Sequence, residues 1–179
     1  MIIISPYDPR WPLLFEAEAI SIRSVVGSAA LRIEHVGSTS VPGLAAKPII
    51  DIQVSVASLE PASMYAELLA RLGYTHIPVG PFDRVYPFFA RPTVLSSTHH
   101  IHLCVQGQEQ ERRHLAFRDY LRFHPHVAAE YVELKKNLAT KHHGTTLESR
   151  ESYSLSKGEF VESVLIQAFS AGYPRPEAP

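Results

Sequence analysis

The sequence predicts an α+β domain in which a mixed β-sheet with flanking helices is followed by a helical C-terminal half. Segments rich in β-branched and aromatic residues, separated by Pro and Gly, are confined to the chain before Glu109. From Glu109 onward, apolar residues recur only at helical spacing. Because the strands come first and the helices later, the order favours an α+β domain over a doubly wound one.

The individual elements follow from periodicity and from the residues that end them. Apolar residues from Trp11 to Val26 recur at helical spacing, and Gly73 ends a later helical segment. The clearest strand surrounds Asp51, where isoleucines and valines alternate with polar residues. We predict helices over about 10–27, 60–72, 109–123, 127–140 and 150–170, and strands over about 31–36, 48–56, 74–78, 84–90 and 99–105.

Length and charge restrict the class of protein. The 179 residues suit a single domain, predicted over residues 5–170, and a disordered Pro-rich tail is predicted over 171–179. Seventeen basic and eighteen acidic residues give a net charge of −1, so nucleic acid is not an expected partner. Cys104 is the only cysteine and cannot form an internal disulfide, which suits a reducing compartment.

The sequence lacks the signals of secretion and of membrane insertion. Its first residues contain three isoleucines but no basic segment before them, unlike a signal peptide. No apolar run approaches the roughly 20 residues that a membrane-spanning helix needs. We therefore expect a cytoplasmic protein without a membrane partner.

A polar turn and a strand aspartate carry the main functional signal. The turn contains Gly37, Ser38 and Thr39, and Asp51 follows in an apolar strand. A glycine lets backbone amides approach an anion, and hydroxyl groups add donors. A carboxylate suits a hard cation such as Mg²⁺. This spacing predicts a site for phosphate and metal, but it also fits a tight turn beside a strand aspartate that pairs with an arginine.

The long string that contains this turn carries a family resemblance. Residues 35–52, HVGSTSVPGLAAKPIIDI, closely resemble the signature of the GrpB family, and further similar pieces extend over about 5–170. The Gly37-Ser38 turn followed by Asp51 also resembles the layout of the polymerase β-like nucleotidyltransferase superfamily. The resemblance implies a nucleotidyltransferase-like fold. It also implies dephospho-CoA kinase as a partner, because a similar domain is fused to that enzyme in some bacteria.

The candidate metal ligands lie on two strands. Alternation places His100 and His102 on one face of their strand, and histidines two residues apart can ligate one metal. We predict Asp51, Gln53, His100 and His102 as metal ligands, with Asp51 and His102 as the catalytic residues. The expected cofactor is a divalent metal, Mg²⁺ or Mn²⁺, with Zn²⁺ as the alternative. Glutamine stands at position 53, where the superfamily layout has a second carboxylate, and this weakens a hard-cation site.

Cations and tyrosines in the helical half supply the candidate phosphate ligands. Pairs four residues apart share a helix face, and cations there can neutralise phosphate. On spacing alone such residues are equally suited to a solvated surface, and the GrpB resemblance favours the pocket. The predicted phosphate-binding set is His35, Gly37, Ser38, Thr39, Lys47, Arg118, Lys135, Tyr153 and Lys157.

Three functions agree with these residues. The first is a protein that binds a nucleotide or another phosphorylated small molecule with a divalent metal, and whose reaction as an enzyme would be nucleotidyl transfer. The second is a non-catalytic ligand-binding or accessory domain linked to coenzyme A synthesis. The third is a metallohydrolase centred on His100, His102 and Asp51.

Overall fold

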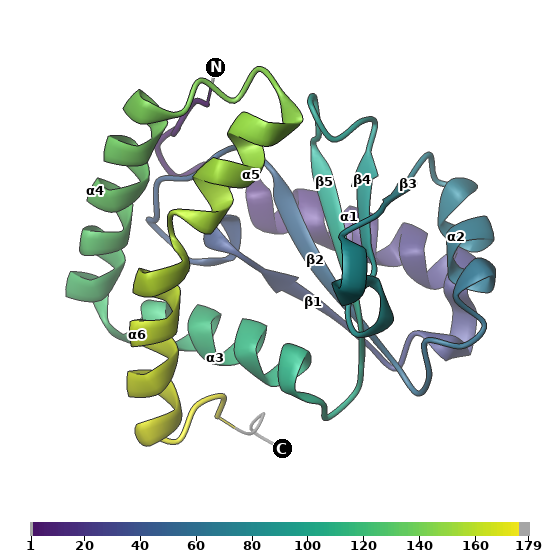
Figure 1. Cartoon of the computed structure of the whole chain (residues 1–179). Helices are drawn as coiled ribbons and strands as arrows, with labels where there is room; N and C mark the ends of the chain where they lie inside the picture. The colour runs from purple at the N-terminus through teal and green to yellow at the C-terminus, as the bar shows by residue number, and fades with distance from the viewer. Residues whose placement is uncertain (1, 176–179) are drawn as a thin grey trace.

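A computed structural model describes residues 2–175 and shows a five-stranded mixed sheet flanked by helices (Figure 1). The strand order is β1-β2-β5-β4-β3. Only the central pair, β2 and β5, is parallel, and the other pairs are antiparallel. The predicted α+β class with a mixed sheet and a helical C-terminal half is confirmed.

The helices and strands agree with the sequence pattern in type and order. The strands are β1 (Arg32–Val36), β2 (Ile50–Val56), β3 (Thr75–Ile77), β4 (Phe88–Arg91) and β5 (His99–Val105). The helices are α1 (Trp11–Val26), α2 (Ala62–Ala70), α3 (Glu109–Phe123), α4 (Pro125–Lys141), α5 (Leu147–Leu155) and α6 (Gly158–Ser170). Among the helices of the described residues, none combines the length and apolar character needed to cross a bilayer.

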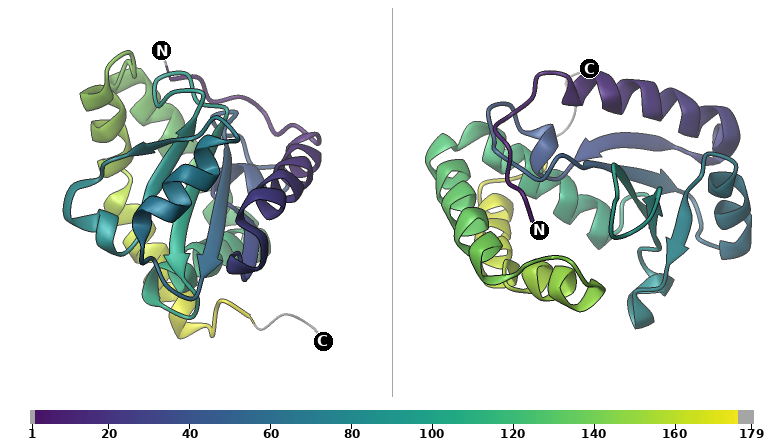
Figure 2. Two further views of the ribbon diagram at one scale, coloured as in Figure 1. Left: turned by 90° about the vertical axis from the view of Figure 1, so that its right-hand side faces the viewer. Right: turned by 90° about the horizontal axis from the view of Figure 1, so that it is seen from above.

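The two faces of the sheet have different partners. Alternate residues of β2, including Ile50 and Ile52, enter an apolar core shared with α1 and α2. The other face carries polar side chains and is turned toward α3 and α5 (Figures 1 and 2). A second apolar core lies among α3, α4 and α6 and holds these helices beside the sheet. The polar face is therefore enclosed by helices without being filled by an apolar core.

Two predicted elements differ from the structure. The helix predicted over 150–170 is two helices, α5 and α6, separated at Ser156 and Lys157. Serines and Gly158 weaken the helix at this point. The two halves also bury different side chains, Tyr153 in a small core with Ile2 and Val164 in the core of α3 and α4.

The other difference lies before β4. The strand predicted over 84–90 begins only at Phe88, because a 3₁₀ turn occupies Gly80–Arg84. Of the predicted tail, residues 176–179 lie outside the described residues, whereas Tyr173 is buried against Tyr120. The described structure therefore continues past residue 170 to residue 175.

Candidate functional site

A cavity of about 320 Å³ lies between the polar face of the sheet and helices α3, α4 and α5. Phe88, Phe117 and Tyr131 form apolar parts of its wall. Most of the predicted site residues, although far apart in the sequence, meet here. Those that line the cavity are Gly37, Ser38, Lys47, Asp51, His100, His102, Lys135, Tyr153 and Lys157.

The Gly37 turn packs directly on the Asp51 side chain. Gly37 has a φ of 67°, which side chains rarely adopt, and a Cβ there would stand 2.5 Å from Asp51 Oδ2. The next residue, Ser38, accepts a hydrogen bond of 3.0 Å from Lys135 Nζ. Glycine at position 37 is therefore required both by backbone conformation and by this close approach.

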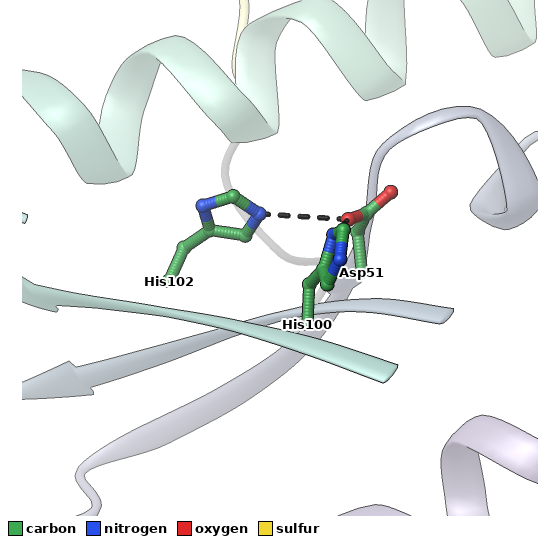
Figure 3. Close-up of side chains that lie close together, drawn as sticks. All are labelled: Asp51, His100 and His102. Atoms are coloured by element: carbon green, nitrogen blue, oxygen red, sulfur yellow. Dashed lines mark hydrogen bonds and ion pairs between the residues drawn. The ribbon is translucent and has the colours of Figure 1, made fainter. Parts of the chain in front are cut away.

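Parallel pairing of β2 and β5 assembles three potential metal ligands. The register places Asp51 opposite His100 and Gln53 opposite His102. Asp51 Oδ1 lies 3.1 Å from His100 Nδ1 and 3.5 Å from His102 Nε2, and both rings turn toward the carboxylate (Figure 3). Burial opposes ionisation of Asp51, but hydrogen bonds from the two histidines hold the pKa of its carboxyl well below the usual range.

This group of three side chains fits a divalent metal. One ligand atom from each residue lies within 4.8 Å of the others. His100 Nε2 is buried and has no hydrogen-bond partner among the described residues, so its partner is a water molecule, a ligand or an ion. One carboxylate with two imidazoles suits Zn²⁺, Mn²⁺ or Fe²⁺ better than Mg²⁺, which prefers oxygen ligands.

Three lysines face this group from other parts of the chain. Lys47 precedes β2, Lys135 lies on α4, and Lys157 stands between α5 and α6. Burial, followed by the charge of Lys157, lowers the pKa of Lys135 to about 7, and burial lowers the pKa of Lys157 to about 8. Within residues 2–175, none of the three lies within 4.0 Å of a carboxylate oxygen. Their charge is therefore poorly solvated and without a counter-charge at close range.

Two tyrosines support these lysines. The ring of Tyr153 lies 5.0 Å from Lys47 Nζ and 4.6 Å from Lys157 Nζ, on cation–π geometry. The ring of Tyr131 lies 4.6 Å from Lys135 Nζ in the same way. The Tyr153 hydroxyl is buried without a hydrogen-bond partner among the described residues, and burial raises its pKa to about 12. A bound ligand would supply the missing partner.

The side chain of Gln53 contacts a residue of α3. It is fully buried on the same face of β2 as Asp51, and its Oε1 lies 2.8 Å from Nδ1 of His114. His114, on α3, was not predicted, although it lines the cavity and its ring packs against that of His102. In the sequence, only the spacing of three residues between His114 and Phe117, which places both on one helix face, could have suggested that His114 lines the cavity.

Two predicted phosphate ligands near the turn have other partners. His35 stacks on Phe15 and donates from Nε2 to Thr39 Oγ1 at 3.0 Å. The Thr39 hydroxyl in turn donates to the carbonyl of Ile49. Val36 lines the cavity, and its neighbour His35 therefore lies on the other face of β1. The His35 side chain points toward α1 and away from the cavity. Neither residue lines the cavity.

Arg118 also lies outside the cavity. Its guanidinium donates to Glu34 at 2.5 Å, to Asp119 at 2.7 Å and to the carbonyl of His35 at 3.1 Å. Two carboxylates therefore neutralise it at the edge strand β1. The sequence also allowed Asp51 to pair with an arginine. The structure shows an arginine–carboxylate pair for Arg118 instead, and Asp51 contacts two histidines.

These features define a mixed α+β domain whose central parallel strands carry one carboxylate and two imidazoles opposite a group of lysines. The sequence model of the family described as GrpB protein matches residues 1–167. The chain therefore belongs to the GrpB family.

Relatives and a solved structure agree with this assignment. The UPF0157 protein YqkA of Bacillus subtilis is 38% identical over 157 residues, which cover 88% of this chain but only 44% of YqkA. A dephospho-CoA kinase of Mycolicibacterium paratuberculosis is 31% identical over 156 residues, or 74% of this chain and 38% of the kinase. The crystal structure of conserved protein GrpB from Enterococcus faecalis matches with a TM-score of 0.81 and 36% identity, covering 94% of this chain and 98% of that one.

Proposed function

We propose that this protein binds a nucleotide or another phosphorylated small molecule, together with a divalent metal, in the cavity between the sheet and helices α3–α5. One observation carries the proposal. Three lysines with no carboxylate partner within residues 2–175 face Asp51, His100 and His102 across the same cavity. A phosphate group would supply the counter-charge that the lysines lack.

Each part of the cavity has a role in this proposal. The ammonium groups of Lys47, Lys135 and Lys157 hold the phosphate oxygens, and the Ser38 hydroxyl adds a short-range contact. Asp51, His100 and His102 hold the metal, which would supply further charge stabilisation to the phosphate when bound. The aromatic wall at Phe88 and Phe117 offers an apolar surface for the rest of the ligand.

Nucleotidyl transfer is the catalytic form of this proposal. The Gly37-Ser38 turn followed by Asp51 is similar to the nucleotidyltransferase layout, and the protein's own contribution would be positioning and electrostatic stabilisation. Standard two-metal transfer uses several carboxylates, and here Asp51 is the only one in the metal group. We therefore place binding first. The similarity to part of a dephospho-CoA kinase favours a phosphorylated coenzyme A precursor among the ligands, and the kinase as a partner.

A metal-dependent hydrolase is the second candidate. The donor set of one carboxylate and two imidazoles favours it, because metallohydrolases commonly hold their metal with three such ligands and leave one position open. Release of inorganic phosphate from a phosphorylated probe by the metal-loaded protein, lost in His102→Ala, would favour hydrolysis. Ligand binding without release would favour the first proposal.

The decisive experiment removes the carboxylate. In isothermal titration with ATP and Mn²⁺, we expect Asp51→Ala to abolish metal-dependent binding while leaving the fold intact, because it removes the only carboxylate of the metal group. Asp8→Ala, which removes a partly exposed carboxylate that does not line the cavity, is the matched control and should bind as the wild type does. Unchanged binding in Asp51→Ala would show that the proposed site is wrong.

A further inference from the structure

Gln53 fixes the hydrogen-bonding state of His114. The Gln53 side chain is fully buried, and its Oε1 lies 2.8 Å from His114 Nδ1. An amide oxygen can only accept a hydrogen bond, so His114 Nδ1 carries the proton in this contact. In the neutral ring the other nitrogen, Nε2, then keeps a free lone pair, which is the form of imidazole that ligates metals.

The ring of His114 lies beside the metal group. His114 lines the same cavity as Asp51, His100 and His102. Its ring packs against that of His102, with centroids 5.2 Å apart and planes at 65°. The sheet register explains the arrangement, because Gln53 on β2 is the direct neighbour of His102 on β5. One amide thus positions an imidazole from α3 next to an imidazole from the sheet.

We propose that His114 is a fourth protein ligand of the metal held by Asp51, His100 and His102, and that Gln53 is the residue that orients it. This inference rests on the proposed function, because it requires the metal site. His114 is not within the 4.8 Å group of three, so the proposal requires its Nε2 to move toward the ion when the ion binds. Metal-ligating histidines usually donate their second ring N–H to an outer acceptor, and the Gln53 amide oxygen is such an acceptor.

In this proposal the residue at position 53 orients a metal ligand, whereas a carboxylate there would bind the metal itself. Gln53 supports a ligand instead of being one, and the site becomes three imidazoles with one carboxylate. Such a set favours Zn²⁺, Fe²⁺ or Mn²⁺ over Mg²⁺. An ion of coordination number five or six keeps at least one position free for an oxygen of the phosphorylated ligand.

The test measures affinity for Co²⁺ alone, by competition with a chelating dye, and records the visible spectrum of the Co²⁺-loaded protein. We expect His114→Ala to weaken Co²⁺ binding roughly 100-fold and to change the spectrum, because one nitrogen ligand is lost. Gln53→Leu, which keeps the side-chain size but removes the acceptor, should weaken binding about 10- to 100-fold. Gln53→Glu keeps an acceptor for His114 and should bind Co²⁺ at least as tightly as the wild type.

The outcomes separate this inference from the proposed function. His143→Ala removes an exposed histidine and is the control, expected to bind as the wild type does. If Asp51→Ala loses Co²⁺ while His114→Ala and its spectrum match the wild type, His114 is not a ligand and the inference fails alone. If Asp51→Ala also binds normally, the metal site itself is wrong. Thermal melting without metal identifies a variant that fails to fold. If His114→Ala fails to fold, weaker Co²⁺ binding in Gln53→Leu but not in Gln53→Glu supports the inference, and equal binding in the two variants overturns it.

Discussion

Arg118 and Lys135 are both buried, yet they differ in their counter-charges. At the edge strand β1, Arg118 is enclosed by the carboxylates of Glu34 and Asp119. In the cavity, Lys135 and Lys157 are desolvated with no carboxylate oxygen within 4.0 Å among the described residues. Burial alone therefore does not identify a ligand site. A buried cation without a counter-charge is the better candidate for a ligand site, because the folded chain has left its desolvation uncompensated.

The pKa directions express the same difference. For Arg118, burial is outweighed by hydrogen bonds to Asp119 and Glu34, and the pKa of the guanidinium is raised. For Lys135, burial and the neighbouring charges of Lys157 and Lys47 outweigh the attraction of Asp51, and the pKa falls to about 7. Arg118 is paired within the protein, whereas Lys135 has no carboxylate partner within residues 2–175.

The largest expected effect is on stability at the β1 edge. Arg118→Met should destabilise the protein by about 3 kcal/mol, because it leaves two partly buried carboxylates short of their main partner. Urea unfolding measures this loss, and ligand binding should stay unchanged. Arg113→Met is the matched control on the same helix. Its partner Glu162 is largely exposed, so the variant should lose no more than about 1 kcal/mol. If Arg118→Met kept its stability but lost ligand binding, Arg118 would have a binding role and not a structural one.

The next effect is on ligand affinity in the cavity. Lys135→Met should weaken binding of ATP with Mn²⁺ about 10- to 100-fold, because a charge-assisted contact worth about 1.5–3 kcal/mol is lost. Its stability should remain within about 1 kcal/mol of the wild type, since relief of a desolvated charge opposes the loss of bonds to Ser38 and Ala45. Lys136→Met, an exposed neighbour paired with Glu133, should change neither quantity.

The pH dependence of binding sharpens the role of the lysines. Phosphate raises the pKa values of Lys135 and Lys157 from about 7 and about 8, so binding near pH 8 takes up protons. Affinity should fall from about pH 7 to about pH 9, by at most tenfold per unit for each lysine. Titration calorimetry in buffers of different ionisation enthalpy measures the uptake, which Lys135→Met should reduce. A flat profile would contradict the assignment.

The same shifts affect the stability of the free protein. Between the lowered folded pKa of each lysine and its unfolded pKa of about 10.5, the unfolded chain binds more protons. The contribution of Lys135 and Lys157 to stability therefore rises with pH across that window.

The smallest expected effect concerns the turn. Thr39→Val should cost about 1 kcal/mol of stability, because His35 Nε2 loses its acceptor and the Ile49 carbonyl loses its donor. Ligand affinity should not change, since Thr39 does not line the cavity. Ser38→Ala is the comparison variant, because Ser38 does line it. If Thr39→Val lost affinity and Ser38→Ala did not, Thr39 and not Ser38 would be the turn residue that contacts the ligand.

Much of the fold followed from local patterns. Alternation along 48–56 and 99–105 predicted which side chains share a face, and the structure confirms that Asp51 and Gln53 lie opposite Ile50 and Ile52. The division between α5 and α6 was missed, because a continuous helical period does not show that two halves pack on different cores. His114 was missed because its significance depends on Gln53, 61 residues away in the chain.

The sequence by itself determined the α+β order, the turn that requires glycine and the aspartate strand, because these depend on neighbouring residues and on alternation along one strand. Only the tertiary structure decided which cations have carboxylate partners and which do not. Arg118 and Lys135 are alike in the sequence, each a cation on an amphipathic helix. Glu34, 84 residues from Arg118, separates their roles, since the energy of a buried charge depends on what the fold brings beside it.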